Sequence, residues 1–196
     1  ATKVTANAFL NGLTTFDADG SDAGVTVSLA ANTKIGSSSF GDGKDTVTLK
    51  INTAEQTSSL GKGSDVATVS ISSAATDKTL SVDIGTGDGV LDKVTITGSG
   101  NVNTATAAGF DNQLLTIDGF DGATDFITFI QGGTLSAQNL VNGAVAGAAT
   151  LFDAVDAVAK LAAGNNAQFV FGGDLYLFRD ADAGAGGINA ADSLVK

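Results

Sequence analysis

The stretch GDGKDTVTLKI, residues 41–51, joins two patterns that decide the fold. Its first five residues follow the order G-x-G-x-D, and glycine and aspartate in such clusters are typical of turns. In the remaining residues apolar and polar side chains alternate, which is typical of a β-strand with one buried and one solvated face. The stretch GKGSDVATVSI at residues 61–71 repeats the same order. The sequence therefore predicts strands that begin directly after Asp/Gly turns.

The same alternation predicts further strands as far as about residue 132. Apolar residues occupy every second position at 25–29, 67–71, 80–84 and 94–96. The aspartates that precede strands are Asp45, Asp65, Asp92 and Asp125, at spacings of 20, 27 and 33 residues. Because the spacings are unequal, we do not expect a strict solenoid with equal rungs. A β-sandwich or an irregular β-solenoid is the expectation for residues 1–132, which makes the fold mainly β.

Residues 133–196 predict a smaller α+β C-terminal part, which we expect either as a second domain or packed together with the first. A helix should begin after the N-cap residue Thr150 and end at Gly164. Its apolar stripe consists of Leu151, Val155, Val158 and Ala162. We also expect a short helix within 134–144, and a buried hairpin from the apolar stretches 169–171 and 175–178, which two glycines separate. An Asp-rich loop follows the hairpin.

The composition excludes several classes of function. The 21 acidic and 10 basic residues give a net charge of −11, with no basic stripe, so binding to nucleic acid or to anionic lipid is not expected. Cys and His are absent, which removes disulfides, zinc sites with the usual ligands and Ser-His-Asp or Cys-His catalysis. No apolar run is long enough to predict insertion into a membrane. The N-terminal residues also lack the apolar core of a signal peptide, so a cytosolic location, a removed signal and export by another route stay open.

The acidic residues are almost all aspartate, since Glu55 is the only glutamate among the 21. Aspartate favours turns and offers a short, stiff carboxylate to a metal ion. A β-rich protein with many turns would show part of this bias without any metal. The bias nevertheless points to calcium as the expected cofactor.

The loop DADAGAGGINAAD, residues 180–192, is the most motif-like calcium candidate. It resembles an EF-hand loop, although it is one residue longer than the standard spacing. The alternative is an acidic turn that caps a last helix starting near Asn189. The candidate ligands are Asp180, Asp182, the carbonyls of Gly184 and Gly186, and Asp192.

Two further groups of aspartates are weaker calcium candidates. In FDADGSDAG, residues 16–24, Asp17, Asp19 and Asp22 surround a glycine, although D-x-D-G is also common in ordinary type I turns. In the G-x-G-x-D turns, Asp45 or Asp65 could form a half site that shares an ion with an adjacent turn. Phosphate binding by these turns is excluded, because none has the P-loop order and each carries an aspartate that would repel phosphate. Two carboxylates could hydrolyse a glycan, but with so many aspartates a chance pair is nearly certain, and we expect no enzyme.

Two stretches of the last 80 residues resemble known proteins. IDGFDGATDFITF at 117–129 is similar to a strand start, and GGDLYLFRDADAGAGGINAADSLVK at 172–196 to an aromatic strand with an Asp-rich loop, in RTX-like and S-layer-type calcium-binding proteins that bacteria export by type I secretion. The resemblance covers residues 117–196. It implies an uncleaved C-terminal export signal, folding triggered by extracellular calcium and a place at the cell surface.

We therefore expect a secreted calcium-binding structural protein that assembles with copies of itself into a surface layer, fibre or biofilm matrix. One-sided Thr/Ser strands offer edges for pairing between molecules, and the negative charge opposes association until a cation neutralises it. Cell-surface polysaccharide is a second expected partner. The alternatives are a monomeric, calcium-stabilised adhesive or ligand-binding module and a polysaccharide-active enzyme on a β-helix.

Overall fold

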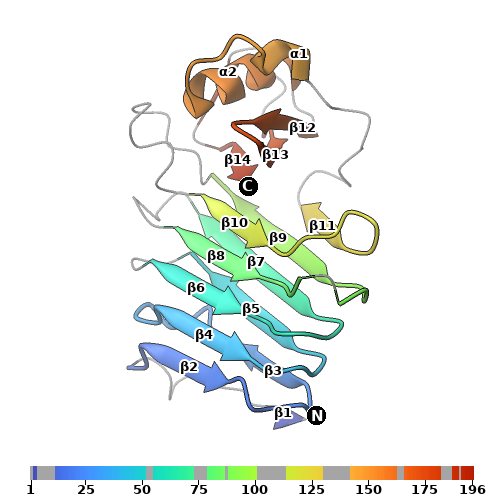
Figure 1. Ribbon diagram of the computed structural model, residues 1–196. Coiled ribbons are helices and arrows are strands. Elements are labelled where there is room, and N and C mark those ends of the chain that lie inside the picture. Colours follow the sequence, from blue (N-terminus) through green and yellow to red (C-terminus); the bar gives the residue numbers. More distant parts are fainter. Residues whose placement is uncertain are drawn as a thin grey trace.

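The computed structural model describes residues 2–3, 12–51, 55–72, 79–86, 88–100, 114–129, 142–162, 166–181, 187–189 and 191–196. In these residues the strands form one six-stranded and one eight-stranded sheet (Figure 1). The six-stranded sheet has the order β1 (Thr2–Lys3), β3 (Val25–Ser28), β5 (Thr46–Lys50), β7 (Val66–Ser72), β9 (Lys93–Ser99) and β11 (Phe126–Phe129). All its neighbouring strands are parallel.

The eight-stranded sheet lies against the first, and in the solenoid it consists of the even-numbered strands. Its parallel part has the order β2 (Thr15–Ala18), β4 (Ser37–Phe40), β6 (Gln56–Ser59), β8 (Leu80–Asp83) and β10 (Leu115–Asp118). Since consecutive strands alternate between the sheets and pair in parallel with the strand two positions away, the chain winds as a solenoid. This confirms the irregular β-solenoid, one of the two predicted architectures.

The unequal aspartate spacings are the register offsets between successive rungs. Thr46 pairs with Val66, Val66 with Lys93 and Lys93 with Phe126, which gives the same intervals of 20, 27 and 33 residues. Every strand predicted from alternation is present, and its apolar positions, such as Val47, Val69 and Ile84, are buried between the sheets. The paired positions therefore stay aligned although the rungs differ in length.

The sheet continues beyond the solenoid into the C-terminal region. β14 (Ser193–Val195) pairs in parallel with β10, and β13 (Asp174–Arg179) and β12 (Asn166–Phe171) follow in antiparallel order. β12 and β13 are the predicted hairpin, and its turn glycines, Gly172 and Gly173, have φ of 63° and 96°. One part of the prediction is wrong, because Val170 and Leu175 near the tip are exposed. The last strand, β14, lies where the alternative reading placed a final helix, and that reading is also wrong.

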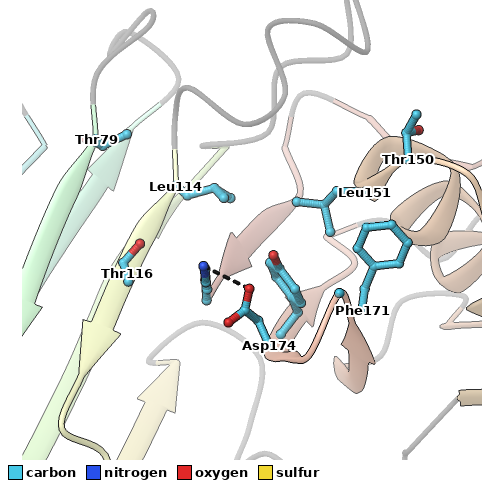
Figure 2. Close-up of a pocket in the computed structure, with 10 residues that line it drawn as sticks. Thr79, Leu114, Thr116, Thr150, Leu151, Phe171 and Asp174 are labelled. Atoms are coloured by element: carbon cyan, nitrogen blue, oxygen red, sulfur yellow. Dashed lines mark ion pairs between the residues drawn. The ribbon is translucent and has the colours of Figure 1, made fainter.

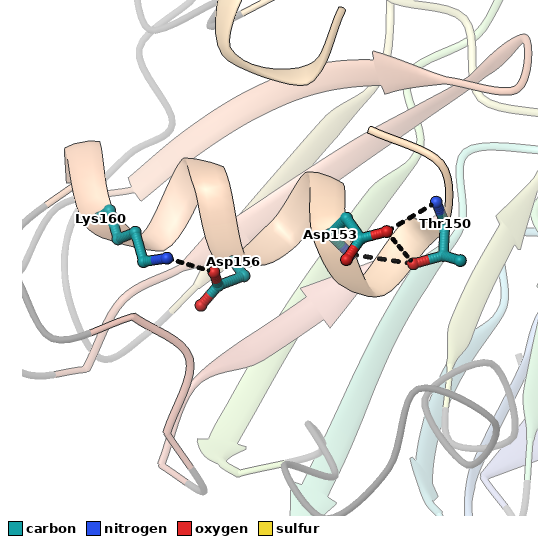
Figure 3. Close-up of polar contacts among 4 residues, drawn as sticks. All are labelled: Thr150, Asp153, Asp156 and Lys160. Carbon is teal, nitrogen blue, oxygen red and sulfur yellow. Dashed lines mark hydrogen bonds and ion pairs between the residues drawn. The ribbon is translucent and has the colours of Figure 1, made fainter. Parts of the chain in front are cut away.

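Two helices pack on this extension of the sheet, α1 (Asn142–Val145) and α2 (Leu151–Ala162). α2 buries the whole predicted stripe against a second core that includes Phe169, Tyr176 and Phe178. Its first turn is closed by a reciprocal cap, in which Asp153 N–H donates to Thr150 Oγ1 at 3.1 Å and the Thr150 hydroxyl donates to Asp153 Oδ2 at 2.8 Å (Figure 3). The predicted helix stop, Gly164, lies outside the described residues, as do 134–141 of the predicted short helix.

Candidate functional site

The predicted Asp/Gly turns form one edge of the solenoid, where the chain crosses from the eight-stranded to the six-stranded sheet (Figure 1). They stack so closely that only glycine fits at their first position. A Cβ atom on Gly61, which has φ of +78°, would lie 2.2 Å from the carbonyl oxygen of Gly41, and one on Gly85 would lie 2.2 Å from that of Gly61. The glycines of the motif therefore bring the backbones of successive turns into contact.

The aspartates that end these turns form a continuous ladder inside the same edge. The carboxylate of each aspartate accepts a hydrogen bond from the backbone N–H at the equivalent position one rung earlier. The bonds run from Val25 N to Asp45 Oδ1 (2.6 Å), Asp45 N to Asp65 Oδ1 (2.7 Å), Asp65 N to Asp92 Oδ1 (2.7 Å) and Asp92 N to Asp125 Oδ1 (3.1 Å). All four carboxylates belong to buried residues. We call these four residues the Asp ladder.

The Asp ladder ends at a valine on one side and at a carboxylate bonded within its own turn on the other. On the rung of β3, before the first aspartate, Val25 occupies the equivalent position, so no carboxylate is present there. In the last rung the N–H of Asp125 donates to the carbonyl of Asp121 at 2.8 Å, and Asp125 Oδ2 accepts from Asp121 N–H at 2.7 Å. The last carboxylate is therefore satisfied within its own turn.

The first two carboxylates of the Asp ladder are only partly hydrogen-bonded. Asp45 Oδ2 and Asp65 Oδ2 are buried and have no hydrogen-bond partner. Burial raises the pKa of Asp65 to about 7 and that of Asp92 to about 6, and the charges of neighbouring aspartates add to both increases. Burial also raises the pKa of Asp45. The interior therefore disfavours the charged form of these groups, and a proton or a cation would stabilise them.

The Asp ladder supplies only one carboxylate from each rung. Within the described ranges, no group of three or more acidic side chains converges to hold a metal ion. Calcium takes about six to eight oxygen ligands. A calcium ion shared by two rungs would therefore need carbonyl oxygens of the turns or water in addition to the carboxylates.

The aspartates of the first turn, Asp17, Asp19 and Asp22, lie outside the Asp ladder and are exposed. Asp17 points outward from β2, where its Oδ1 accepts from Asp19 N–H and from the Ser39 hydroxyl, each at 3.2 Å. These two hydrogen bonds lower the pKa of Asp17. The structure therefore joins Asp17 to Asp19 but keeps this turn separate from Asp45 and Asp65.

In the C-terminal loop, Asp180 and Asp192 are both buried. Asp192 Oδ1 accepts from Ala181 N–H at 2.9 Å, and Asp192 Oδ2 accepts from Asn189 N–H at 2.8 Å. This carboxylate therefore joins the two ends of the loop through backbone amides. The other predicted ligands, Asp182, Gly184 and Gly186, lie outside the described residues.

Two members of the Asp ladder, Asp92 and Asp125, were absent from the predicted metal ligands. The sequence grouped them with Asp45 and Asp65 as aspartates that precede strands, but their turns are longer than G-x-G-x-D, so they were not named as ligands. The signal that identifies them is the position of one aspartate directly before each of β5, β7, β9 and β11. No family model, curated protein or solved structure matches this chain.

Proposed function

We propose that this chain is a secreted structural β-solenoid that binds calcium along the Asp ladder and assembles with copies of itself into an extracellular layer, fibre or matrix. The observation that carries the proposal is the pair of buried, unpartnered oxygens, Asp45 Oδ2 and Asp65 Oδ2, on adjacent rungs. Unpaired buried carboxylates are costly, and a bound cation would remove that cost.

The ligand chemistry favours a hard cation. The edge offers carboxylate and carbonyl oxygens, and the sequence has no cysteine or histidine for a softer metal. Adjacent rungs are separated by about 4.7–4.9 Å, so two charged carboxylates on neighbouring rungs repel each other unless a proton or a cation lies between them. Extracellular calcium would occupy even a weak site, with a dissociation constant of about 10⁻⁴ to 10⁻³ M.

Exposed apolar side chains on the last two Asp/Gly turns support assembly. These residues, which we call the apolar turn patch, are Val90, Leu91, Phe120 and Phe126. The side chain of Phe126 is 59% exposed, and it lies on β11, the last strand of the six-stranded sheet. Apolar groups next to a strand at a sheet edge are suited to contact with a second copy, while the net charge of −11 opposes that contact until cations bind.

Calcium titration with two readouts tests the proposal. We expect millimolar calcium to raise the melting temperature and the particle size measured by light scattering, relative to the protein in chelator. Asp65→Asn should weaken both responses, whereas Asp42→Asn, an exposed position in the neighbouring turn, should preserve them. If the protein is monomeric and equally stable in chelator and in calcium, the proposal is wrong. Stabilisation without growth in size would favour the monomeric module.

A second pair of variants separates assembly from calcium binding. Phe126→Ser should reduce the growth in particle size and preserve the calcium-dependent rise in melting temperature, because Phe126 is exposed and lies outside the Asp ladder. Leu161→Ser is the matched control, since Leu161 is 62% exposed on α2. Equal assembly by both variants would exclude the apolar turn patch as the contact.

A further inference from the structure

The outer face of the eight-stranded sheet is polar and open as far as β10, and beyond β14 it is covered by α2. Along the solenoid it presents a row of hydroxyl side chains on successive rungs: Thr15, Ser37, Thr57, Ser81 and Thr116. Directly after the next strand, β14, the neighbour of Thr116 is Lys196, whose backbone hydrogen-bonds to Leu115 and Ile117. The following neighbour, on β13, is Tyr176, and its side chain is buried in the second core beneath α2. The polar outer face of the sheet therefore ends beside the N-terminus of α2.

A pocket of about 600 Å³ lies at this step (Figure 2). Ligand pockets commonly have volumes of about 300–1,000 Å³, so a small molecule fits. The sheet contributes Thr79, Leu114 and Thr116, the start of α2 contributes Thr150 and Leu151, and the hairpin and last strand contribute Phe171, Gly172, Asp174, Tyr176 and Lys196.

The polar groups of the pocket are placed to bind hydroxyl groups. Lys196 Nζ and Asp174 Oδ2 form an ion pair at 2.9 Å, and each side chain stays partly exposed, so the pair offers both donors and an acceptor. The hydroxyls of Thr79 and Thr116 make no hydrogen bond to another residue in the described part of the chain. The Thr150 hydroxyl, in contrast, is already used by the helix cap. The hydroxyls of Thr79 and Thr116 and one charged pair therefore line the pocket.

The apolar side chains and the charges around the pocket favour a neutral ligand with both apolar and hydroxyl groups. The half-buried ring of Phe171 and the side chains of Leu114 and Leu151 add apolar surface to the lining of the pocket. Asp174 balances the charge of Lys196, and Asp83 and Asp118 lie on the outer face beside Ser81 and Thr116, so the surroundings repel anions. A sugar ring matches this combination, because it presents C–H groups on its faces and hydroxyls around its edge.

We propose that this pocket binds one unit of a neutral oligosaccharide, with the following units lying along the hydroxyl row over Thr116 and Ser81. The row gives the extended chain further hydrogen-bonding groups on each rung, separated by about 4.7–4.9 Å. The site uses none of the residues of the Asp ladder. The proposal therefore does not depend on calcium binding or on self-assembly.

Calorimetric titration with defined sugars tests the site. The probes are hexasaccharides of glucose, mannose and N-acetylglucosamine, with a uronic-acid hexasaccharide as the anionic comparison. We expect at least one neutral probe to bind and the uronic-acid probe to bind more weakly. Phe171→Ala and Thr116→Val should each weaken the binding about five- to tenfold, since each removes one contact. Thr116→Ser, which restores the hydroxyl, should recover the affinity.

The matched control is Thr68→Val, which removes a hydroxyl from the outer face of the six-stranded sheet. It should bind like the wild type, and unchanged melting temperatures should show that all variants are folded. The proposal fails if no neutral probe binds at millimolar concentration, or if the uronic-acid probe binds most tightly. It also fails if Thr68→Val weakens binding as much as Thr116→Val. Calcium removal separates this site from the proposed function, because sugar binding by folded protein in chelator is expected to persist.

Discussion

The backbone N–H of Asp45 donates to the carboxylate of Asp65 at 2.7 Å, across one rung of the solenoid. The sequence interval between these residues is the interval between the strands that follow them, Thr46 pairing with Val66. One aspartate therefore serves two purposes: it satisfies a backbone donor at the start of the previous strand and fixes the register of its own strand. The same contact buries a carboxylate whose second oxygen has no partner.

The first prediction concerns the pH dependence of stability in chelator. Burial raises the pKa of Asp65 from 3.8 to about 7 and that of Asp92 to about 6. Between these values and 3.8 the folded protein holds more protons than the unfolded chain, so the free energy of unfolding should fall as the pH rises from 5 to 8. The slope approaches about 1.4 kcal/mol per pH unit for each proton. Urea unfolding at several pH values measures it.

Other aspartates do not reverse this expectation. The pKa values of Asp17 and Asp88 are lowered from 3.8 by hydrogen bonds from backbone amides, so their contributions change only below that pH. Millimolar calcium should flatten the fall between pH 5 and pH 8 if the cation replaces the proton. Stability that rises with pH over this range in chelator would contradict the assigned role of burial.

The second prediction is that Gly61→Ala strongly destabilises the solenoid. Gly61 has a positive φ, and a Cβ atom there would collide with the carbonyl of Gly41 in the previous turn. The backbone conformation alone costs about 1–3 kcal/mol for a residue other than glycine, and the collision adds to it. Gly20→Ala is the control, because its Cβ would meet open space. The free energies of unfolding of the two variants, measured by chemical denaturation, should differ by at least about 1–3 kcal/mol.

The third prediction concerns the helix cap in the C-terminal region. Thr150→Ala removes the hydroxyl that accepts from Asp153 N–H and donates to Asp153 Oδ2. Loss of such a cap costs about 0.5–2 kcal/mol. Thr150→Ser keeps the hydroxyl and should retain most of the stability. Equal loss in both variants, measured by thermal unfolding, would indicate that packing of the threonine methyl group matters more than the cap.

The sequence predicted strands whose inward side chains are apolar, such as β5 and β7, and it did not identify β4 and β6, whose inward side chains are partly polar. β4 and β6 read SSSF and QTSS, yet Ser38 and Ser58 point into the solenoid and hydrogen-bond to each other at 2.8 Å. Gln56 is also buried, and its amide donates to the carbonyl of Ile35. Gln56 Oε1 has no hydrogen-bond partner. The side-chain hydrogen bonds that these three residues do make join neighbouring rungs, which alternation in a single strand cannot reveal.

In the candidate site, too, the residues within a short motif were predicted as ligands, and the residues that only strand pairing brings together were not. Asp45 and Asp65 were predicted from a motif of five residues, because the turn itself carries the pattern. Asp92 and Asp125 were also predicted to precede strands, but longer turns come before them, so the five-residue motif did not name them as ligands. The pairing of Lys93 with Phe126 places them in the same ladder. The pocket beside α2 has no sequence signature, since its lining comes from five separate stretches of the chain.

The last prediction separates the two roles of Asp65, acceptor and buried charge. Asp65→Asn keeps an oxygen that can accept from Asp45 N–H and removes the charge, so in chelator at pH 8 its stability should equal or exceed that of the wild type. Asp65→Leu leaves the buried N–H of Asp45 without an acceptor, which costs about 1–3 kcal/mol. Asp42→Asn, in the exposed part of the preceding turn, should match the wild type. If urea unfolding gives the leucine variant the stability of the asparagine variant, the rung-to-rung hydrogen bond contributes little, and the Asp ladder would be retained for its charge alone.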